Sequence, residues 1–173
     1  MNKYVSFLRG INVGGHKKVP MGELKKQFGK LGFKNVKTVL ASGNVIFDGE
    51  AEKLQLIPDH LDKSFGFKIP VITIPFDKIE EIIKYDPFGK IEVTPKTRLY
   101  VTFLATEQKS NLSIPFTTDD GSFSIIRQTG SFLFSVLDLE KTSTVDAMNI
   151  LEKEFGKNIT TRNYNTVQKI AKL

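Results

Sequence analysis

The chain has 173 residues, no cysteine and a formal net charge of +6 at neutral pH, which excludes disulfides, thiolate catalysis and cysteine-based metal sites. Of its residues 40% are hydrophobic and 14 are Phe, enough for the interior of one domain or of two small ones. No apolar run is long enough to span a membrane, and strand-like sequence starts too early to leave room for a signal peptide. We therefore expect a cytoplasmic protein, whose positive charge either favours an anionic partner or only maintains solubility.

The first part of the chain has the pattern of a β-α-β-β-α-β unit. Pro20 opens a helix whose apolar positions keep helical spacing up to a stop at Gly32. The segment "ASGN" predicts a tight hairpin in which Gly43 or Asn44 takes positive φ. The last helix of the unit is expected to be disturbed at Pro58. Strands are expected at 4–8, 36–40, 44–48 and 69–74, and helices at 20–31 and 50–65.

Three blocks of the first half recur in the second half in the same order. They pair "KYVSFL" at 3–8 with "LYVTFL" at 99–104, "ASGNVIF" at 41–47 with "QTGSFLF" at 128–134, and "SFGFKI" at 64–69 with "EFGKNI" at 154–159. An internal duplication is the best explanation. The sequence thus predicts an α+β fold of two tandem ferredoxin-like βαββαβ units, each an antiparallel sheet with helices on one face. The units are expected at 1–76 and 97–173, with a linking helix and connector at 77–96 and a C-terminal helix at 165–171.

The loop "RGINVGGHK", which follows the first strand, is the main candidate site. Gly43 lies 35 residues after Leu8, whereas the matching Gly130 lies 26 residues after Leu104, so this nine-residue loop is an apparent addition that the fold does not require. It is not a nucleotide-binding phosphate loop, because His16 stands where the lysine belongs and no Ser or Thr follows. Its glycines still expose backbone N–H groups near a helix N-terminus, where anions are favoured. The alternative is an ordinary mobile loop with solvated lysines.

The strand order expected for such a unit is 4-1-3-2, so the end of the first strand lies beside the start of the third. A guanidinium, two carboxamides, a hydroxyl and glycine N–H groups then converge at one edge of the sheet and suit a carboxylate, phosphate or sugar-like ligand. The alternative for Ser42 and Asn44 is that they only form the hairpin turn. The ligand-binding residues predicted at this edge are Arg9, Gly10, Asn12, Gly14, Gly15, Lys17, Ser42, Gly43 and Asn44.

A second polar cluster, "TTRNYNT", occupies 160–166. We expect Asn165 to cap the last helix, with Gln168 completing a capping-box-like pattern. Arg162 and Asn163 are not needed for that cap, and they would complete the binding pocket if the C-terminal segment folds back over the first unit. A structural ion pair is the alternative role for Arg162.

RNA-recognition modules share the β-α-β-β-α-β order, but they need aromatic side chains on the open face of the sheet. With Val5 and Phe7 placed under the helices, the outward residues of the first strand are Tyr4, Ser6 and Leu8. Such a face suits packing against another surface, such as the second subunit of a homodimer, better than base stacking, so nucleic-acid binding is disfavoured. No metal-ligand spacing, nucleophile elbow or carboxylate pair occurs. The sequence therefore predicts no catalytic residue, metal or cofactor.

Three blocks of the sequence carry a resemblance to a known family. "YVSFLRGINVGGHKKVPMGELK", "VLASGNVIF" and "TTRNYNTVQKIAKL" resemble the signature blocks of domain-of-unknown-function family 1697, a group of bacterial proteins, over essentially the whole chain. The resemblance implies a two-part α/β fold related to ferredoxin-like units and no established activity. The family commonly has Trp at the position of Tyr164. The resemblance places these residues in signature positions: Arg9, Gly10, Asn12, Gly14, Gly15, Ser42, Gly43, Asn44, Arg162, Asn163 and Thr166.

Two functions of different classes remain open. The first is the binding of an anionic small molecule or nucleotide at the edge formed by 9–17 and 42–44. The second is a protein-interaction or regulatory module whose signature residues are structural. An open cleft at the signature residues favours the first, and side chains satisfied by hydrogen bonds within the protein favour the second.

Overall fold

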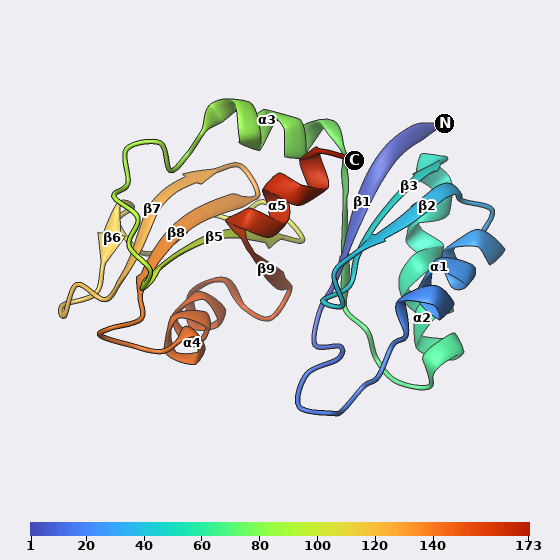
Figure 1. Ribbon diagram of the computed structural model, residues 1–173, viewed down its shortest axis with the longest axis horizontal. Helices are drawn as coiled ribbons and strands as arrows, with labels where there is room; N and C mark the ends of the chain where they lie inside the picture. Colours follow the sequence, from blue (N-terminus) through green and yellow to red (C-terminus); the bar gives the residue numbers. More distant parts are fainter. The chain divides into compact units, whose positions relative to one another are not determined.

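The computed structural model describes residues 1–173, which divide into two compact units. The first unit comprises Met1–Ile82 together with Ile170–Leu173, and the second comprises Ile83–Lys169. Each unit contains one antiparallel sheet (Figure 1). Two helices, α3 (Asp77–Tyr85) and α5 (Tyr164–Ala171), include residues of both units. The protein is therefore a mixed α+β protein with two antiparallel sheets and five α-helices.

The sheet of the first unit has the strand order β2-β3-β1-β4, which confirms the expected order 4-1-3-2. The helix expected over 50–65 is divided: its first part is a 3-10 helix, and the α-helix starts only at Ile57. Pro58 therefore lies in the first turn of α2, where its missing N–H costs no hydrogen bond. The elements are β1 (Asn2–Leu8), α1 (Met21–Lys30), β2 (Lys34–Val39), β3 (Asn44–Gly49), η1 (Ala51–Leu56), α2 (Ile57–Phe65) and β4 (Val71–Pro75).

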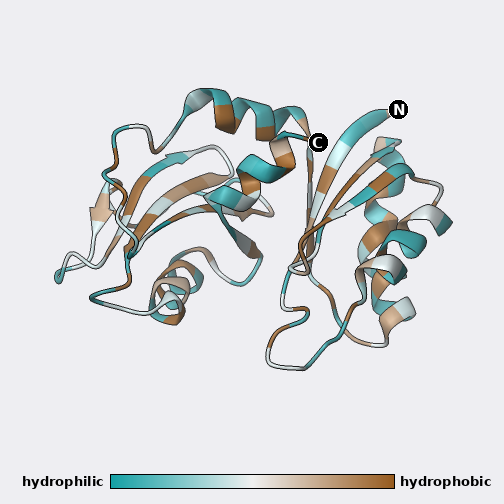
Figure 2. Cartoon of the chain, in the orientation of Figure 1, coloured by the Kyte–Doolittle hydropathy of each residue, from teal (hydrophilic) through white to brown (hydrophobic).

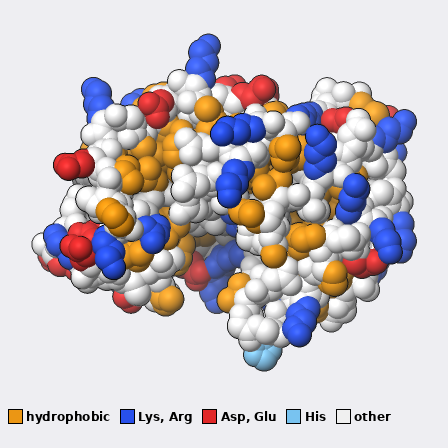
Figure 3. All heavy atoms as spheres, viewed as in Figure 1, with side chains coloured by type: hydrophobic (Ala, Val, Ile, Leu, Met, Phe, Trp, Pro, Cys, Tyr) orange, Lys and Arg blue, Asp and Glu red, His pale blue; other side chains and the backbone are white.

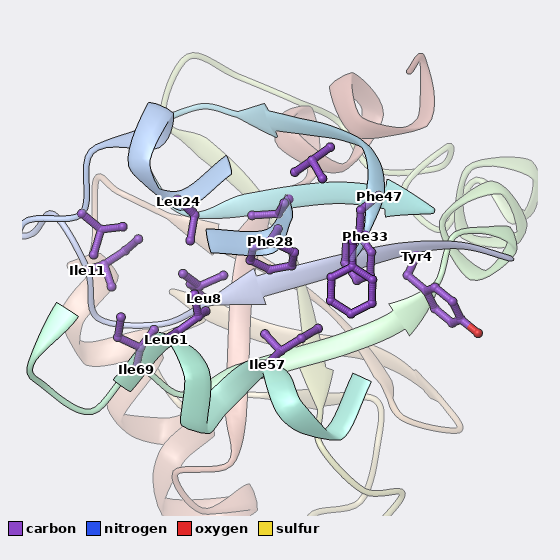
Figure 4. Packing of buried hydrophobic residues seen from close by; sticks show 13 residues of the cluster. Tyr4, Leu8, Ile11, Leu24, Phe28, Phe33, Phe47, Ile57, Leu61 and Ile69 are labelled. Atoms are coloured by element: carbon purple, nitrogen blue, oxygen red, sulfur yellow. The ribbon is translucent and has the colours of Figure 1, made fainter. Parts of the chain in front are cut away.

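The core of the first unit lies between its sheet and the helices α1 and α2, each of which mixes hydrophobic and hydrophilic residues (Figure 2). Tyr4 and Leu8 of β1 pack in this core with Phe28 of α1 (Figure 4). The expectation that Val5 and Phe7 lie under the helices is therefore wrong, because the alternation of a strand puts them on the opposite face. Both are nevertheless fully buried. A strand buried on both faces reads as a continuous apolar run, so its sequence does not show which face the helices cover.

The sheet of the second unit has the order β6-β7-β8-β5-β9, in which β7-β8-β5-β9 repeats the arrangement of β2-β3-β1-β4. The prediction of a βαββαβ second unit is wrong in one element: no helix lies between β5 and β7. The intervening segment, 105–122, has Pro115 and many turn-forming residues, and it forms a loop and the short strand β6. The elements are β5 (Thr97–Leu104), β6 (Phe116–Thr117), β7 (Phe123–Thr129), β8 (Phe132–Asp138), α4 (Thr144–Phe155) and β9 (Ile159–Asn163).

Side-chain hydrogen bonds hold this loop on the C-terminal end of α4. Glu154 Oε1 accepts a hydrogen bond from Ser110 Oγ at 2.8 Å and another from the Asn111 amide. Gln108 Nε2 donates to the carbonyl oxygen of Phe155 at 2.8 Å. The loop thus covers this part of the second unit in place of the expected helix.

No helix of the chain combines the length and the hydropathy that crossing a membrane needs.

A turn before β7 makes part of the stability of the second unit sensitive to acid. Asp120 Oδ1 accepts hydrogen bonds from Ser122 Oγ at 2.7 Å, from the Ser122 amide at 3.0 Å and from Thr118 Oγ1 at 2.7 Å. These bonds lower the pKa of Asp120 from 3.8 to about 2. Because the folded pKa is the lower one, the turn stabilises the fold above pH 3.8 and loses this contribution as the pH falls towards 2.

We therefore expect the melting temperature of the unmodified protein to fall more steeply over this acidic range than that of the Asp120→Asn variant. Circular dichroism melts in steps of pH measure both slopes. Asp119→Asn removes the same charge one residue earlier without removing these hydrogen bonds, and it should keep the steep slope. Equal slopes for the two variants would contradict the assignment.

Candidate functional site

The loop between β1 and α1 is anchored in the core at both of its ends. Ile11 and Val19 are buried members of the first unit's core, and Ile11 lies close to Leu8 (Figure 4). The Asn12 amide donates to the carbonyl oxygen of Lys17 at 3.1 Å and closes the loop at its base. The residues between Asn12 and Val19 are exposed. The loop therefore presents a solvent-accessible tip on a fixed base.

The side chain of Asn12 forms the main connection within this base. Its Oδ1 accepts a hydrogen bond from the Val19 amide at 2.8 Å, and its Nδ2 donates to the carbonyl oxygen of Val19 at 3.0 Å. Nδ2 also donates to the carbonyl oxygen of Ala41 at 2.8 Å. Asn12 has φ 56°, in the left-handed region that Asn tolerates better than most residues. Asn12 thus ties the loop to the β2–β3 hairpin and positions it.

Gly43 allows the loop and the hairpin to approach each other closely. The Leu8 amide donates to the carbonyl oxygen of Gly43 at 2.8 Å. Gly43 has φ +80°, and a Cβ atom added there would lie 2.7 Å from Ile11 Cδ1 and 2.8 Å from Leu8 Cβ. No side chain fits at such distances without a shift of its neighbours. The structure thus brings together the two segments that the sequence places at this edge.

Asn44 is fully buried in the hairpin, with Nδ2 donating to the carbonyl oxygen of Val39 at 2.7 Å and to Ser42 Oγ at 3.0 Å. The residues of the turn with positive φ are Leu40 and Gly43, and Asn44 is not one of them. The side-chain amide of Asn44 therefore stabilises the hairpin turn. This agrees with the alternative in which Ser42 and Asn44 only form the turn. Ser42 itself is exposed.

A surface depression of about 440 Å³ lies at the base of the loop, next to the start of α1. Gly14 and Gly15 have φ 59° and 77°, and Lys17 has φ 48°. No side chain caps α1 at Pro20, so the first N–H groups of this helix have no intrahelical or capping partner. The positive end of the helix dipole therefore adds to the charge of the lysines here. The depression is lined by Asn12, Gly15, Lys18, Val19, Pro20, Met21 and Ala41.

Lys18 is the charged residue of this depression, and the sequence prediction missed it although it directly follows the predicted Lys17. Lys17 turns towards the segment before β4: its Nζ donates to the carbonyl oxygen of Lys68 at 3.4 Å and lies 5.9 Å from the centre of the Phe67 ring. Arg9 is half-buried, and its amide donates to the carbonyl oxygen of Pro70 at 2.9 Å. Lys18 is thus the lysine that lines the depression, beside the start of α1.

The remaining predicted residues, Arg162, Asn163 and Thr166, belong to the second unit. Arg162 is buried in β9, where Nη1 donates to Thr160 Oγ1 at 2.8 Å, and burial lowers the pKa of its guanidinium to about 10. Asn163 Oδ1 accepts a hydrogen bond from the Asn165 amide at 2.9 Å. Because α5 starts at 164, the cap is Asn163, and the expectation that Asn165 caps this helix is wrong.

The fold and the loop define a mixed α+β protein with two antiparallel sheets and a glycine-rich loop after its first strand. The chain belongs to the family described as "Protein of unknown function (DUF1697)", which matches residues 1–134. It is also similar to a solved structure titled "The structure of conserved bacterial protein SP0830 from Streptococcus pneumoniae", with 22% identity, a TM-score of 0.67, and coverage of 99% of this chain and 97% of that chain. This likeness shows the fold. No curated protein matches the chain.

Proposed function

We propose that the protein binds an anionic small molecule or nucleotide at the edge formed by 9–17 and 42–44. The observation that carries this proposal is the loop fixed by Asn12, which holds an exposed glycine-rich tip beside the uncapped start of α1. Backbone N–H groups, a helix N-terminus and lysines are the groups with which proteins bind phosphates and carboxylates. The depression at this place supplies room for a ligand.

The geometry supports a division of roles among the signature residues. Asn12, Gly43 and Asn44 shape the site, because their contacts lie within the protein. Contacts with the ligand then come from the N–H groups of the loop tip and of the first turn of α1, and from the ammonium group of Lys18, while Lys17 adds positive charge nearby. This division favours an anion held from one side by point charges and backbone donors.

A protein-interaction or regulatory module is the second candidate function. One observation favours it: the side-chain amides of Asn12 and Asn44 both donate to backbone carbonyls, as residues with a structural role do. Nucleic-acid binding has less support, since within each unit the Lys and Arg side chains on the face in Figure 3 are separated by hydrophobic and uncharged side chains. The lysines of the loop separate the two main candidates, because only ligand binding needs them.

The test compares two double variants with the same change of net charge. We expect Lys17→Gln/Lys18→Gln to weaken the binding of pyrophosphate or ATP about tenfold or more, because loss of the charge-assisted contact of Lys18 alone costs roughly 1.4 kcal/mol. Lys30→Gln/Lys63→Gln, with both changes on exposed helix positions of the same unit, should leave it nearly unchanged. Isothermal titration calorimetry at low salt measures both. If both variants bind like the unmodified protein, the proposed site is wrong.

We also infer that the two units are copies of one ferredoxin-like unit, 1–76 and 97–173, joined by 77–96, in a cytoplasmic bacterial protein. The matching order of four strands supports the duplication. So do two pairs of hydroxyls at matching positions, one in each unit: Ser6 Oγ lies 2.6 Å from Thr73 Oγ1, and Thr102 Oγ1 lies 2.8 Å from Thr161 Oγ1. Each pair joins the first strand of its unit to the last, so the similarity extends to contacts inside the sheets.

A further inference from the structure

A second hollow of the first unit, of about 640 Å³, lies at the strand β2 and shares no lining residue with the depression at the loop. Its lining includes three lysines from three different elements, Lys3 of β1, Lys25 of α1 and Lys37 of β2. One acidic side chain, that of Asp48, is also part of the lining. Positive charge is therefore concentrated on a concave surface.

An irregularity in β2 orients one of these lysines. In the β2–β3 ladder, Lys34 is opposite Asp48 and Lys37 is opposite Ile46, with a register shift between the two pairs. Residues three apart in a regular strand lie on opposite faces, whereas this shift puts both lysines on the face of Ile46 and Asp48. Asn35, with φ 51°, lies within the shift. The bulge therefore turns Lys37 to the face of the sheet that α1 and α2 do not cover.

Lys3 lies on the same face, because it is the partner of Asp48 in the β1–β3 ladder. Its Nζ is 3.7 Å from the centre of the Phe76 ring, a cation–π contact that holds the ammonium group in place. Lysines on an edge strand such as β2 discourage pairing with other chains, which accounts for Lys37. It does not account for Lys3 on an inner strand or for Lys25 on a helix.

The charge of the hollow is not compensated by ion pairs. Asp48 Oδ2 accepts a hydrogen bond from Asn35 Nδ2 at 2.6 Å, and neither Lys25 nor Lys37 forms an ion pair. Some exposed lysines elsewhere in this unit do have carboxylate partners, as in the pair of Lys26 with Glu23 at 3.6 Å. A concave surface with excess charge of one sign concentrates ligands of the opposite sign.

We propose that this hollow binds an organic phosphate with at least two negative charges, whose apolar part contacts the exposed side chain of Leu173. Ammonium groups on flexible stems act as point charges that adapt to several phosphate oxygens, so three of them suit a diphosphate or triphosphate better than a single carboxylate. The volume is within the range of small-molecule sites. This inference does not depend on the function proposed for the loop.

A titration of the ¹⁵N-labelled full chain with ATP and with pyrophosphate, followed by amide NMR at low salt, tests the proposal. We expect saturable shifts at 35–37 and 46–48, with ATP binding more tightly than pyrophosphate because of its apolar part. Lys25→Gln/Lys37→Gln should weaken this binding about tenfold or more. Lys30→Gln/Lys63→Gln, which changes the net charge of the same unit equally, should change it less than about twofold.

The same spectra show whether each variant is folded, and the single variant Lys37→Gln, on an exposed edge position, replaces the double variant if that one is not. Equal weakening by the two double variants would mean attraction to net charge alone and would overturn the proposal. Shifts confined to 13–18 would overturn it while supporting binding at the loop. Shifts confined to the hollow would support it and count against the loop. The absence of any shift would overturn both.

Discussion

Replacing Asn12 by alanine should lower the free energy of unfolding of the first unit by about 3 kcal/mol, since three hydrogen bonds at roughly 1 kcal/mol each are lost. The Val19 amide and the carbonyls of Val19 and Ala41 lose their partner in this variant. We expect hydrogen exchange at the Val19 amide to accelerate most, because that N–H donates directly to Asn12 Oδ1. Hydrogen exchange by NMR and urea unfolding measure the two effects.

Two matched variants separate the causes of this loss. Asn12→Gly removes the same hydrogen bonds but accepts φ 56° without strain, so it should be less destabilising than Asn12→Ala by up to about 1 kcal/mol. Asn35→Ala also acts at a positive φ, 51°, where the exposed side chain makes one bond, to Asp48. It should cost about 1 kcal/mol. If Asn12→Ala costs no more than Asn35→Ala, Asn12 does not hold the loop as inferred.

Replacing Gly43 by alanine should lower the free energy of unfolding of the first unit by about 3 kcal/mol, because of backbone strain and crowding and not because of lost hydrogen bonds. Roughly 1 kcal/mol comes from a side chain at positive φ, and about 2 kcal/mol from forcing a Cβ atom against its neighbours. The contacts concerned are those with Ile11 Cδ1 and Leu8 Cβ, at 2.7 and 2.8 Å. Urea unfolding followed by near-ultraviolet circular dichroism measures the change.

Gly15→Ala is the matched control, because Gly15 has nearly the same φ, +77°, but no atom lies within 4 Å of an added Cβ. This variant should show the cost of the backbone alone, about 1 kcal/mol. The difference between the two alanine variants then reports how closely the loop is packed on the hairpin. A difference near zero would show that the hairpin and the loop can move apart freely.

Much of the first unit could be predicted from its sequence. Helical and strand periodicity, with Pro20, Gly32 and the "ASGN" turn as boundaries, indicated every element except the 3-10 helix η1, and the βαββαβ pattern gave the strand order. Two features could not be predicted. The prediction of which face of β1 the helices cover was wrong because both faces of this strand are buried. The prediction of a helix between β5 and β7 was wrong because matching strands do not require matching connections. A loop held by Glu154 takes the place of that helix.

The proximity of the loop and the hairpin was predicted from the topology, but the contacts of their individual residues were not. Topology placed Asn12 near Gly43 and Asn44, and the structure does bring these residues together. Whether a carboxamide faces solvent or a backbone carbonyl depends on distances that the sequence does not contain. The same holds for the cap of α5, where one residue decides between Asn163 and Asn165. The bulge that turns Lys37 outward likewise depends on a register shift between two strands.

The division of the chain into units has a consequence for its synthesis and its fragments. Ile170–Leu173 belongs to the first unit although more than eighty residues of the second unit precede it in the chain. On the ribosome, the first unit can gain its last members only after the whole second unit has emerged. A fragment that stops near residue 82 would lack Ile170, which is fully buried. The first unit is therefore not a continuous stretch of the gene, and the smallest continuous piece that contains all of it runs from Met1 to Leu173.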